Sequence, residues 1–473
     1  MEHDCKTPGY STGDKTSFAY TSARERWPII ITQAIDDVYR SVAQTDDAAK
    51  TTEGRSIINE LAQLKYQVQH DRQLTPIPDD GGSDVELYNK ELEQRGNPTW
   101  LNANWLFSEC YLYRRISTNF SLSTHWKGYD VFARQKIKTF RSSRPAVAEL
   151  AARYGQLVKQ LQEHKAGDGE ADKLLFREMC EICLWGNATD LSLLTALSYD
   201  DIQKLQGSEA RRAAEANILV DDLDAAFDAL VAARRAKPGP TERRRVDIVL
   251  DNAGFELYVD LILAGYLLEA GFATEIVLHP KEIPWFVSDV VPADFAALLN
   301  ALANPKAFYE TPSDEEALQD KKPEPLSERE ATDMAFLFSK WTELYAEGKI
   351  LLRPNSFWTQ AGSYWRLPAQ CPFLFDELKS SELVIFKGDL NYRKLTGDAA
   401  WDPTTPFAEA IGPLGRGSDV NVLALRTCKA DVVVGLKAGQ DEQLRQQDKD
   451  ADPAARRWAW GGKYAVVSYS HGA

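Results

Sequence analysis

Two polar side chains end a run of apolar residues in the segment VDIVLDNAGF, residues 246–255. The apolar run predicts a short strand covered on both faces, and the sequence after Gly254 predicts a helix that starts at once. Asp251 and Asn252 are therefore expected at the carboxyl end of a strand, which is where ligands bind in open α/β sheets. The competing interpretation is a helix N-cap, in which such a side chain only accepts a backbone N–H bond.

Two further polar clusters follow strand-like runs later in the chain. SELVIFKGDLNYRKLTGD, residues 381–398, places Asp389 directly after an apolar segment. Asp289 lies in a polar and aromatic loop after the run ATEIVLH, residues 273–279. If the sheet is parallel, the strand ends share one edge and these clusters can face one crevice.

The chemistry that these clusters jointly suit is phosphate chemistry with a hard metal ion. Asp and Asn oxygens without nearby cysteines or paired histidines favour Mg²⁺ or Mn²⁺ over zinc. Arg393, Lys394 and Lys429 could hold phosphate oxygens, Arg through forked hydrogen bonds and Lys as a point charge. A single cluster of this kind is more often a solvated turn, and the three together shift the balance toward a site.

Other catalytic signatures are missing from the sequence. There is no GxxxxGK[ST] loop and no HExxH or GxSxG motif, and no strand runs into GxGxxG. The glycines of IGPLGRGSD, residues 411–419, follow FAEA rather than a strand, which indicates a flexible loop.

The elements that position these residues divide the chain into two regions. From about residue 25 to 235, apolar residues recur every three or four positions, which predicts helices and no convincing strand. After the linker at 236–245, strand-like runs alternate with helices. We therefore expect an α/β protein, with a mainly helical domain at 1–235 and an α/β metal- and phosphate-binding domain at 236–473. The strand-like runs are RVDIVLD, ATEIVLH, KILLRP, SELVIFKGD, ADVVVGL and KYAVVSY.

Composition narrows the range of partners. The 473 residues include 55 Lys and Arg against 70 Asp and Glu, a formal charge of −15, which argues against nucleic acid or an anionic membrane as a partner. There is no signal peptide pattern and no run of ~18 apolar residues of the kind that spans a membrane. We expect a soluble cytoplasmic protein, with access to the nucleus and oligomeric state left open, whose partner is a small phosphorylated metabolite. Its six cysteines are expected as free thiols.

Four segments in this order, VLDNAGFELYVDLILA, KEIPWFVSDV, FKGDLNYRKL and RTCKADVVVGL, resemble the damage-control phosphatase family, formerly a domain of unknown function (89). The branch is the one with an Arg-Thr-x-Lys motif, here residues 426–429, which is also described as acidic residue (protein-glutamate) O-methyltransferase. WLFSECYLYRRI around Glu109 and CLWGNATDLSLL around Asn187 and Asp190 are similar to family segments as well. The resemblance covers roughly residues 20 to 470.

The resemblance implies an N-terminal helical bundle beside a three-layer α/β/α sandwich with a mostly parallel sheet and a divalent metal at its carboxyl edge. It implies that Asp251, Asn252 and Asp289 hold the metal, which is expected to be Mn²⁺ or Mg²⁺, with Co²⁺ or Ni²⁺ as further candidates. Asp251 and Asn252 are also implied to act in catalysis. The residues implied to contact the phosphorylated substrate are Asp251, Asn252, Asp389, Leu390, Asn391, Tyr392, Arg393 and Lys429.

The activity that the resemblance implies is hydrolysis of small sugar phosphates, such as fructose 1-phosphate and fructose 6-phosphate, to clear damaged or surplus metabolites. A metal that bridges phosphate oxygens neutralises developing charge and lowers the pKa of bound water, as this hydrolysis requires. The alternatives are S-adenosylmethionine-dependent methyl transfer to protein glutamate and non-catalytic binding of a sugar phosphate. Against the first, the DNAGF turn is not glycine-rich. Against the second, clustered carboxylates without a cation repel one another.

Several questions stay open at the level of sequence. Glu109, Asn187 and Asp190 either line the pocket or only join helices to one another. Asp251 lacks the DxDxT setting of the best-known aspartyl phosphatases, so a phospho-aspartyl intermediate and a directly activated water both remain alternatives.

Overall fold

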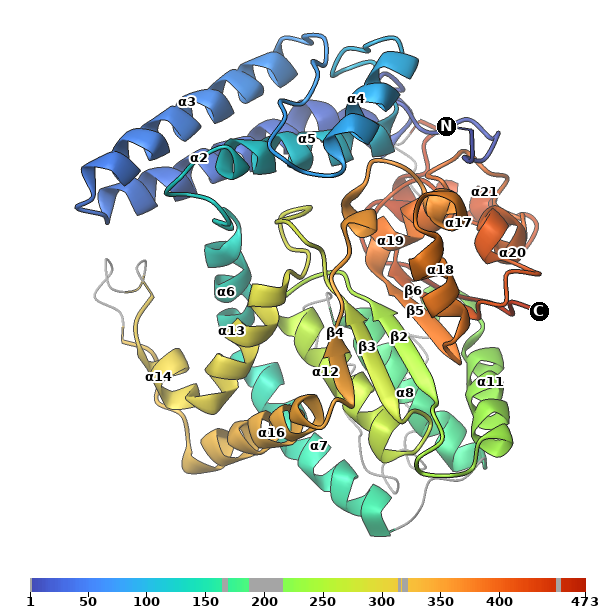
Figure 1. Ribbon diagram of the computed structural model, residues 1–473. Helices are drawn as coiled ribbons and strands as arrows, with labels where there is room; N and C mark the ends of the chain where they lie inside the picture. The colour runs from blue at the N-terminus through green and yellow to red at the C-terminus, as the bar shows by residue number, and fades with distance from the viewer. Residues whose placement is uncertain (1, 164–168, 187–215, 314–315, 317–321, 448–451) are drawn as a thin grey trace.

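One mostly parallel sheet of seven strands organises the described part of the chain (Figure 1). The computed structural model describes residues 2–163, 169–186, 216–313, 316, 322–447 and 452–473, so Asn187 and Asp190 lie outside the described residues. The strands lie in the order β1-β7-β6-β5-β2-β3-β4. Their bounds are β1 (Ile218–Asp221), β2 (Arg245–Val249), β3 (Glu275–His279), β4 (Ile350–Leu352), β5 (Leu383–Lys387), β6 (Val422–Thr427) and β7 (Ala465–Ser470).

The order of the strands places a topological switch point between β2 and β5. From β2 the chain adds β3 and then β4 on one side, and it returns to place β5 on the other side of β2. These pairs and the β5–β6 pair are parallel, whereas β6 and β7 are antiparallel. Ligands bind at such switch points because the loops diverge there and leave a crevice at the carboxyl ends of the strands.

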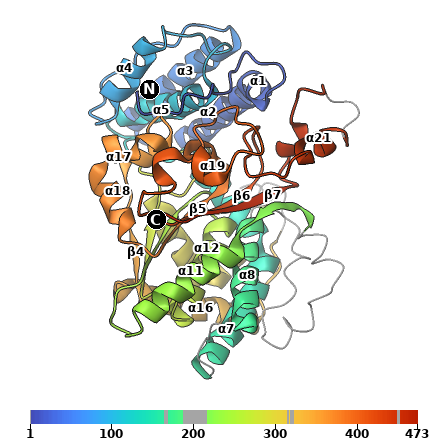
Figure 2. The same ribbon diagram turned by 90° about the vertical axis from the view of Figure 1, so that its right-hand side faces the viewer.

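Helices flank the sheet and also form a bundle above it (Figures 1 and 2). The bundle comprises α1 (Phe18–Thr21), the π-helix η1 (Ser22–Arg26), α2 (Trp27–Ala43), α3 (Ala48–Gln69), α4 (Val85–Gln94) and α5 (Trp105–Ser121). The other helices are α6 (Ala133–Ser142), α7 (Arg144–Glu163), α8 (Glu170–Trp185), α11 (Leu223–Ala236), α12 (Phe255–Glu269), α13 (Pro292–Ala303), α14 (Pro305–Glu310), α16 (Glu328–Ala346), α17 (Leu367–Gln370), α18 (Pro372–Lys379), α19 (Gly388–Leu395), α20 (Phe407–Ala410) and α21 (Gln440–Arg445). Short 3₁₀ turns are η3 (Ser356–Thr359), η4 (Tyr364–Arg366), η5 (Gly412–Leu414) and η6 (Arg457–Ala459).

Both faces of the sheet are buried, as the predicted α/β/α sandwich requires. In β5, Leu383 and Ile385 belong to the core shared with α7, α8, α11, α12 and α16. Val384 and Phe386 point to the opposite face, where α17 to α20 form a second core. This alternation follows from the two-residue period of a strand, and it explains why the central strands read as continuous apolar runs.

The N-terminal bundle is seated on the loops at the carboxyl edge of the sheet (Figure 2). Its own core takes in Trp285, Leu390 and Ala430, three residues that follow β3, β5 and β6. Burial of this apolar surface holds the bundle, α1 to α5 with η1, over the sheet edge where the predicted site residues lie. We call this bundle the roof of the site.

The predicted elements are confirmed with two corrections. The helical region contains a strand, β1, which pairs with β7 at the edge of the sheet. The run ADVVVGL is not a strand, and β6 lies before it. Val432 O accepts a hydrogen bond from Arg426, and Val434 N donates to the Tyr392 hydroxyl, while Gly435 N and Leu436 N donate to loop carbonyls, so side chains and a loop rather than a neighbouring strand satisfy this buried backbone.

Two other expectations bear on organisation. The core that covers one face of the sheet includes residues of α7, α8 and α11, all of which precede residue 237, and the domain boundary near residue 235 stays a prediction. Among the described helices, none combines the length and the apolar character that crossing a bilayer demands. All six cysteines are free, as expected.

Candidate active site

The loops after β2 and β3 are joined to each other at the carboxyl edge of the sheet. Val290 N donates to Asp251 O over 2.8 Å, and Asn252 and Asp289 pair as an isolated antiparallel bridge. The N-cap of α12 is Gly254, so neither Asp251 nor Asn252 has the capping role that was the competing interpretation. The two loops are therefore held side by side, and together they present the three predicted metal ligands, Asp251, Asn252 and Asp289.

The loop that carries Asp289 is held in a strained conformation. Phe286 and Val287 have φ angles of 43° and 68°, in the left-handed region that a β-branched residue such as Val rarely enters. Each costs about 1–2 kcal/mol, so the surroundings must impose this geometry. Lys281 pins the same loop, because its backbone N donates to Val290 O and its ammonium donates to Leu250 O, both over 2.7 Å.

Close approach of α19 to the end of β2 depends on Gly388. This residue has a φ of 80°, and a Cβ placed on it would lie 1.9 Å from Asp251 Oδ2. The first turn of α19 can therefore pass directly beside the Asp251 carboxylate. The two predicted strand ends meet here, as the parallel pairing of β2 with β5 requires.

A cavity of about 230 Å³ opens where these loops meet the helical roof. It collects seven of the ten predicted site residues, from Asp251 in the first loop to Lys429 after β6. The lining residues are Arg26, Trp105, Glu109, Asp251, Asn252, Phe286, Ser288, Asp289, Asp389, Leu390, Arg393 and Lys429. Glu109 is thus part of the wall, which answers one of the questions that the sequence left open.

The other predicted residues, Asn391, Tyr392 and Lys394, do not line this cavity, and the buried Lys394 ammonium donates to Gln360 O over 2.6 Å. The Asn391 amide donates to Leu250 O over 3.1 Å and to Lys387 O over 2.7 Å, which ties α19 to the ends of β2 and β5. The Tyr392 hydroxyl accepts from Val434 N. The Asn391 and Tyr392 side chains are fully buried, and their contacts position the strand ends.

Asp389 and Lys429 meet at the end of β6. The Asp389 carboxylate accepts from Arg426 Nε over 2.8 Å and from Lys429 N over 2.9 Å. Arg426 is itself buried, with its guanidinium 4.3 Å from the Tyr392 ring centroid. Asp389 therefore shapes the Arg-Thr-Cys-Lys segment, whereas no carboxylate among the described residues pairs with the Lys429 ammonium.

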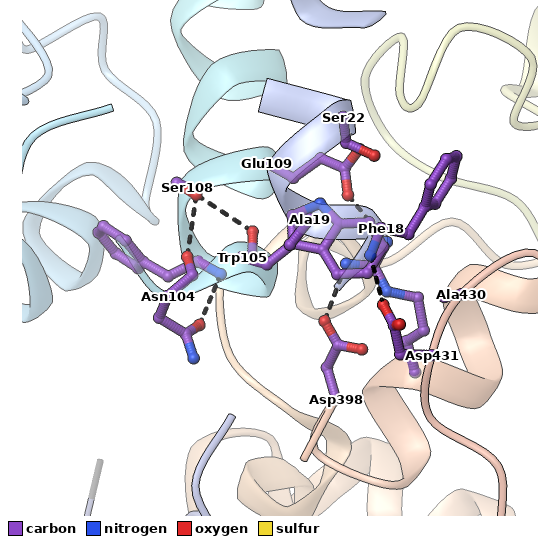
Figure 3. Close-up of polar contacts among 12 residues, drawn as sticks. Phe18, Ala19, Ser22, Asn104, Trp105, Ser108, Glu109, Asp398, Ala430 and Asp431 are labelled. Atoms are coloured by element: carbon purple, nitrogen blue, oxygen red, sulfur yellow. Dashed lines mark hydrogen bonds and ion pairs between the residues drawn. The ribbon is translucent and has the colours of Figure 1, made fainter. Parts of the chain in front are cut away.

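Arg393 is enclosed by the roof and by its own loop. Its guanidinium donates to Glu109 Oε2 over 2.8 Å and to Asp398 Oδ2 over 2.9 Å, and it lies 3.8 Å from the Trp105 ring centroid. Figure 3 shows Glu109 and Trp105 beside Asp398, where the bundle meets the α/β part. The charge of Arg393 is thus largely balanced by protein carboxylates.

Two carboxylates at this edge are poorly matched to their surroundings. Burial raises the pKa of Asp251 well above its usual range, and the nearby Glu256 and Asp289 carboxylates raise it further. Burial also raises the pKa of Asp289 to about 6, against the opposing effect of Lys281. Asp289 Oδ2 lies 3.3 Å from Lys281 Nζ but accepts no hydrogen bond.

The orientation of the Asn252 side chain is fixed by acidic neighbours. Its amide nitrogen donates to Asp251 Oδ2 over 2.9 Å and to Glu256 Oε2 over 2.8 Å. Glu256 is in turn held by the buried Lys387 ammonium over 3.1 Å. Because both amide protons are engaged, Asn252 Oδ1 is left as the acceptor, and the Ser288 hydroxyl donates to it.

These groups fit a hard divalent cation. Two carboxylates and an amide oxygen are the donor set that Mg²⁺ and Mn²⁺ prefer, and the buried Asp289 Oδ2, which accepts no hydrogen bond, suits such a ligand. In the part of the chain that the structure describes, no group of three His, Cys, Asp or Glu side chains could hold a metal ion. The predicted set supplies only two such residues, because its third member is Asn252.

Residues that the sequence did not single out complete the site. Arg26 and Trp105 come from the roof, Ser288 and Lys281 from the loop after β3, and Gly388 from the start of α19. The glycine alone carried a signal, since Gly before Asp after a strand is typical of close backbone approach.

Together the fold and the site define a class: an α/β/α protein whose sheet has, at its switch point, a cavity lined by carboxylates and by arginine and lysine side chains. Residues 22–444 match the sequence model of the Damage-control phosphatase ARMT1-like domain, and the chain belongs to that family. This confirms the resemblance drawn from the sequence. Family membership supports a metabolite-repair phosphatase function.

Relatives align over nearly their whole length. The chain is 34% identical to Damage-control phosphatase ARMT1 of Xenopus laevis, over 96% of each chain. It is 31% identical to the protein of the same name from Danio rerio, over 99% of each chain, and 31% identical to that from Homo sapiens, over 96% of this chain and 97% of the other. A crystal structure of a DUF89 family protein from Pyrococcus horikoshii aligns with a TM-score of 0.36 and 14% identity over 86% of this chain and 92% of that one.

Proposed function

We propose that this protein is a divalent-metal-dependent phosphatase that hydrolyses phosphomonoesters of small sugars, of the fructose 1-phosphate or fructose 6-phosphate type. The observation that carries the proposal is that one cavity contains both carboxylates whose negative charge is incompletely balanced and a lysine whose positive charge no carboxylate pairs with. The pKa values of Asp251 and Asp289 stay raised even though Lys281 lies 3.3 Å from Asp289, and Lys429 is a cation without a carboxylate partner among the described residues. A divalent cation and a phosphate dianion satisfy both at once.

Each residue has a role in this proposal. Asp251, Asn252 and Asp289 would hold the metal, most favourably Mn²⁺ or Mg²⁺. The bound metal would neutralise charge on the phosphate and lower the pKa of a water molecule. Lys429 would bind a phosphate oxygen, and Glu256 would keep the Asn252 oxygen facing the cavity.

Cavity size favours a small substrate. The volume of about 230 Å³ is below the ~300–1,000 Å³ that drug-sized ligands occupy. A small phosphorylated metabolite suits this space better than a methyl donor of drug size together with a protein glutamate. Methyl transfer is the alternative that metal dependence separates from hydrolysis.

The test is phosphate release from fructose 1-phosphate and fructose 6-phosphate by the purified protein. EDTA should abolish release, and Mn²⁺ or Mg²⁺ should restore it in the wild-type protein but not in Asp289→Asn. Asp228→Asn is the matched control, because it removes a carboxyl charge from the exposed face of α11 and should leave release unchanged. Absence of release with every metal, across a panel of sugar phosphates, would refute the proposal.

A further inference from the structure

The roof of the cavity contributes a cation whose charge the described protein does not balance. Arg26 is the last residue of the π-helix η1, lines the cavity and is exposed to solvent. Its guanidinium makes a single long hydrogen bond, from Nη1 to Ser22 Oγ over 3.3 Å, and lies 5.2 Å from the Phe18 ring centroid. Among the described residues, no carboxylate lies within ion-pair distance of it.

The unusual helix geometry sets the direction of this side chain. Trp27 N donates to Ser22 O, five residues earlier, so η1 contains one residue more per turn than an α-helix. Trp27 is fully buried in the core of the bundle, with its indole nitrogen donating to Glu109 over 3.2 Å. With its neighbour anchored inside, Arg26 is placed on the cavity wall. Such π-turns occur frequently at functional sites.

The other arginine of the cavity makes a clear contrast. Arg393 is 3% exposed and already bonded to Glu109 and Asp398. A substrate anion that bound Arg393 would compete with two carboxylates, whereas at Arg26 it would compete only with the long hydrogen bond to Ser22. Guanidinium groups bind phosphate through paired hydrogen bonds, which makes an unpaired one in an anion site effective.

We propose that Arg26 is a phosphate-binding residue, supplied by the N-terminal bundle from the side of the cavity opposite the sheet edge. The substrate phosphate would lie between the metal ligands and Lys429 on one side and Arg26 on the other. This inference rests on the proposed phosphatase function. It makes the helical bundle part of the substrate site and not only a cover over it.

The experiment measures two quantities in Arg26→Gln, Arg26→Lys and the control Arg40→Gln. The first is the Kd of inorganic phosphate with Mn²⁺ present, by calorimetry, and the second is KM for fructose 1-phosphate. Arg40 is an exposed arginine on α2, roughly 20 Å further along the helix axis. Circular dichroism confirms that each variant is folded.

Arg26→Gln should raise both the Kd and KM by about 10-fold, as loss of a hydrogen bond to a charged group predicts. Arg26→Lys, which keeps the charge without the fork, should raise them less, and Arg40→Gln should match the wild-type protein. Equal values for Arg26→Gln and Arg40→Gln in an active enzyme would overturn the role of Arg26 and leave the phosphatase proposal standing. A raised KM with an unchanged phosphate Kd would also overturn it, because Arg26 would then contact another part of the substrate.

If the wild-type protein releases no phosphate, the proposed function fails and the phosphate Kd alone decides on Arg26. Weaker binding by Arg26→Gln than by Arg40→Gln would still support a phosphate site at the roof. No phosphate binding by the wild-type protein would overturn the inference together with the function.

Discussion

Two aspartates four residues apart, one in β2 and one just after it, have opposite surroundings. Asp247 is fully buried and accepts hydrogen bonds from Arg245 Nε over 2.7 Å, from the His279 ring over 2.6 Å and from the Ser381 hydroxyl. Burial alone would raise its pKa, but the hydrogen bonds and charges of His279 and Arg245 hold the pKa below its usual range. Asp251, which is 7% exposed, has its pKa raised by burial and by Glu256 and Asp289.

The difference separates a carboxylate that the protein neutralises from one that we propose as a metal ligand. The protein neutralises Asp247 entirely with its own groups, so this aspartate stabilises the packing of β2 against β3 and the segment before β5. At Asp251 the charges of Lys429 and Lys281 do not offset burial and the nearby Glu256 and Asp289 carboxylates, which costs stability unless a ligand supplies more positive charge. Asp247 and Asp251 are the same residue type and are both buried, and they differ in the hydrogen-bond donors and charges that surround the carboxylate.

A matched pair of substitutions should separate the effect of Asp251 on activity from the effect of Asp247 on stability. Asp251→Asn should reduce metal-dependent phosphate release by about 100-fold or more, because a metal ligand is worth several kcal/mol in the transition state. Its free energy of unfolding should stay within about 1 kcal/mol of wild type. Asp247→Asn should instead lower that free energy by about 3–5 kcal/mol, since it leaves Arg245 buried without its carboxylate.

Phosphate release and urea unfolding on both variants provide the measurement. The variant at position 247 should keep its activity per folded molecule at temperatures where it remains folded. Equal losses of stability in the two variants, or an active Asp251→Asn enzyme, would show that the two carboxylates do not differ in the way proposed.

A smaller effect should come from closing the space beside Asp251. Gly388→Ala should lower phosphate release by roughly 10-fold, because its Cβ would lie 1.9 Å from Asp251 Oδ2 and the carboxylate would have to move. The substitution should also cost about 1–2 kcal/mol of stability, the cost of an L-residue at a φ of 80°.

Gly271→Ala isolates the backbone part of that effect. Gly271 has a φ of 68°, but nothing lies within 4 Å of the place where its Cβ would go. This control should lose similar stability and no activity. If both glycine variants lose activity equally, backbone strain and not contact with Asp251 would be responsible.

The central part of this comparison was accessible from the sequence. Asp251, Asn252 and Asp289 follow strand-like runs, and the period of two and the parallel arrangement place such residues on one edge. Lys429 and the segment after β5 were also named from their residue types, and the resemblance assigned them to the substrate. The contribution of Arg26 was not accessible, because it depends on a bundle some 225 residues earlier in the chain folding over the edge.

Hydrogen bonds between distant residues also explain the misplaced elements. ADVVVGL has the composition of a strand, yet Arg426 and Tyr392 take up its backbone groups. β1 has only four residues, too few for a strand pattern to stand out in the sequence, and it is a strand because it pairs with β7. In both cases tertiary contacts decided between conformations that the local pattern allowed.

The smallest expected effect is a pH dependence of stability with opposite signs for the two kinds of carboxylate. The folded pKa of Asp289 is raised to about 6, so the metal-free folded protein binds more protons than the unfolded chain between about pH 4 and 6. Its free energy of unfolding should therefore fall as pH rises through that window, by on the order of 1–2 kcal/mol from this group. Asp247, whose pKa is lowered, should act in the reverse sense and cost stability only as pH falls below about 4.

Urea unfolding in EDTA from pH 4.5 to 7 should show the fall in the wild-type protein and a smaller one in Asp289→Asn. Asp251 titrates in the same direction, so the fall should not vanish entirely in that variant. Mn²⁺ binds the deprotonated carboxylates, and saturating metal should reverse the slope in the wild-type protein. Identical slopes in the two proteins, with and without metal, would mean that Asp289 is balanced by the protein as Asp247 is. The distinction between the two carboxylates would then lose its electrostatic basis.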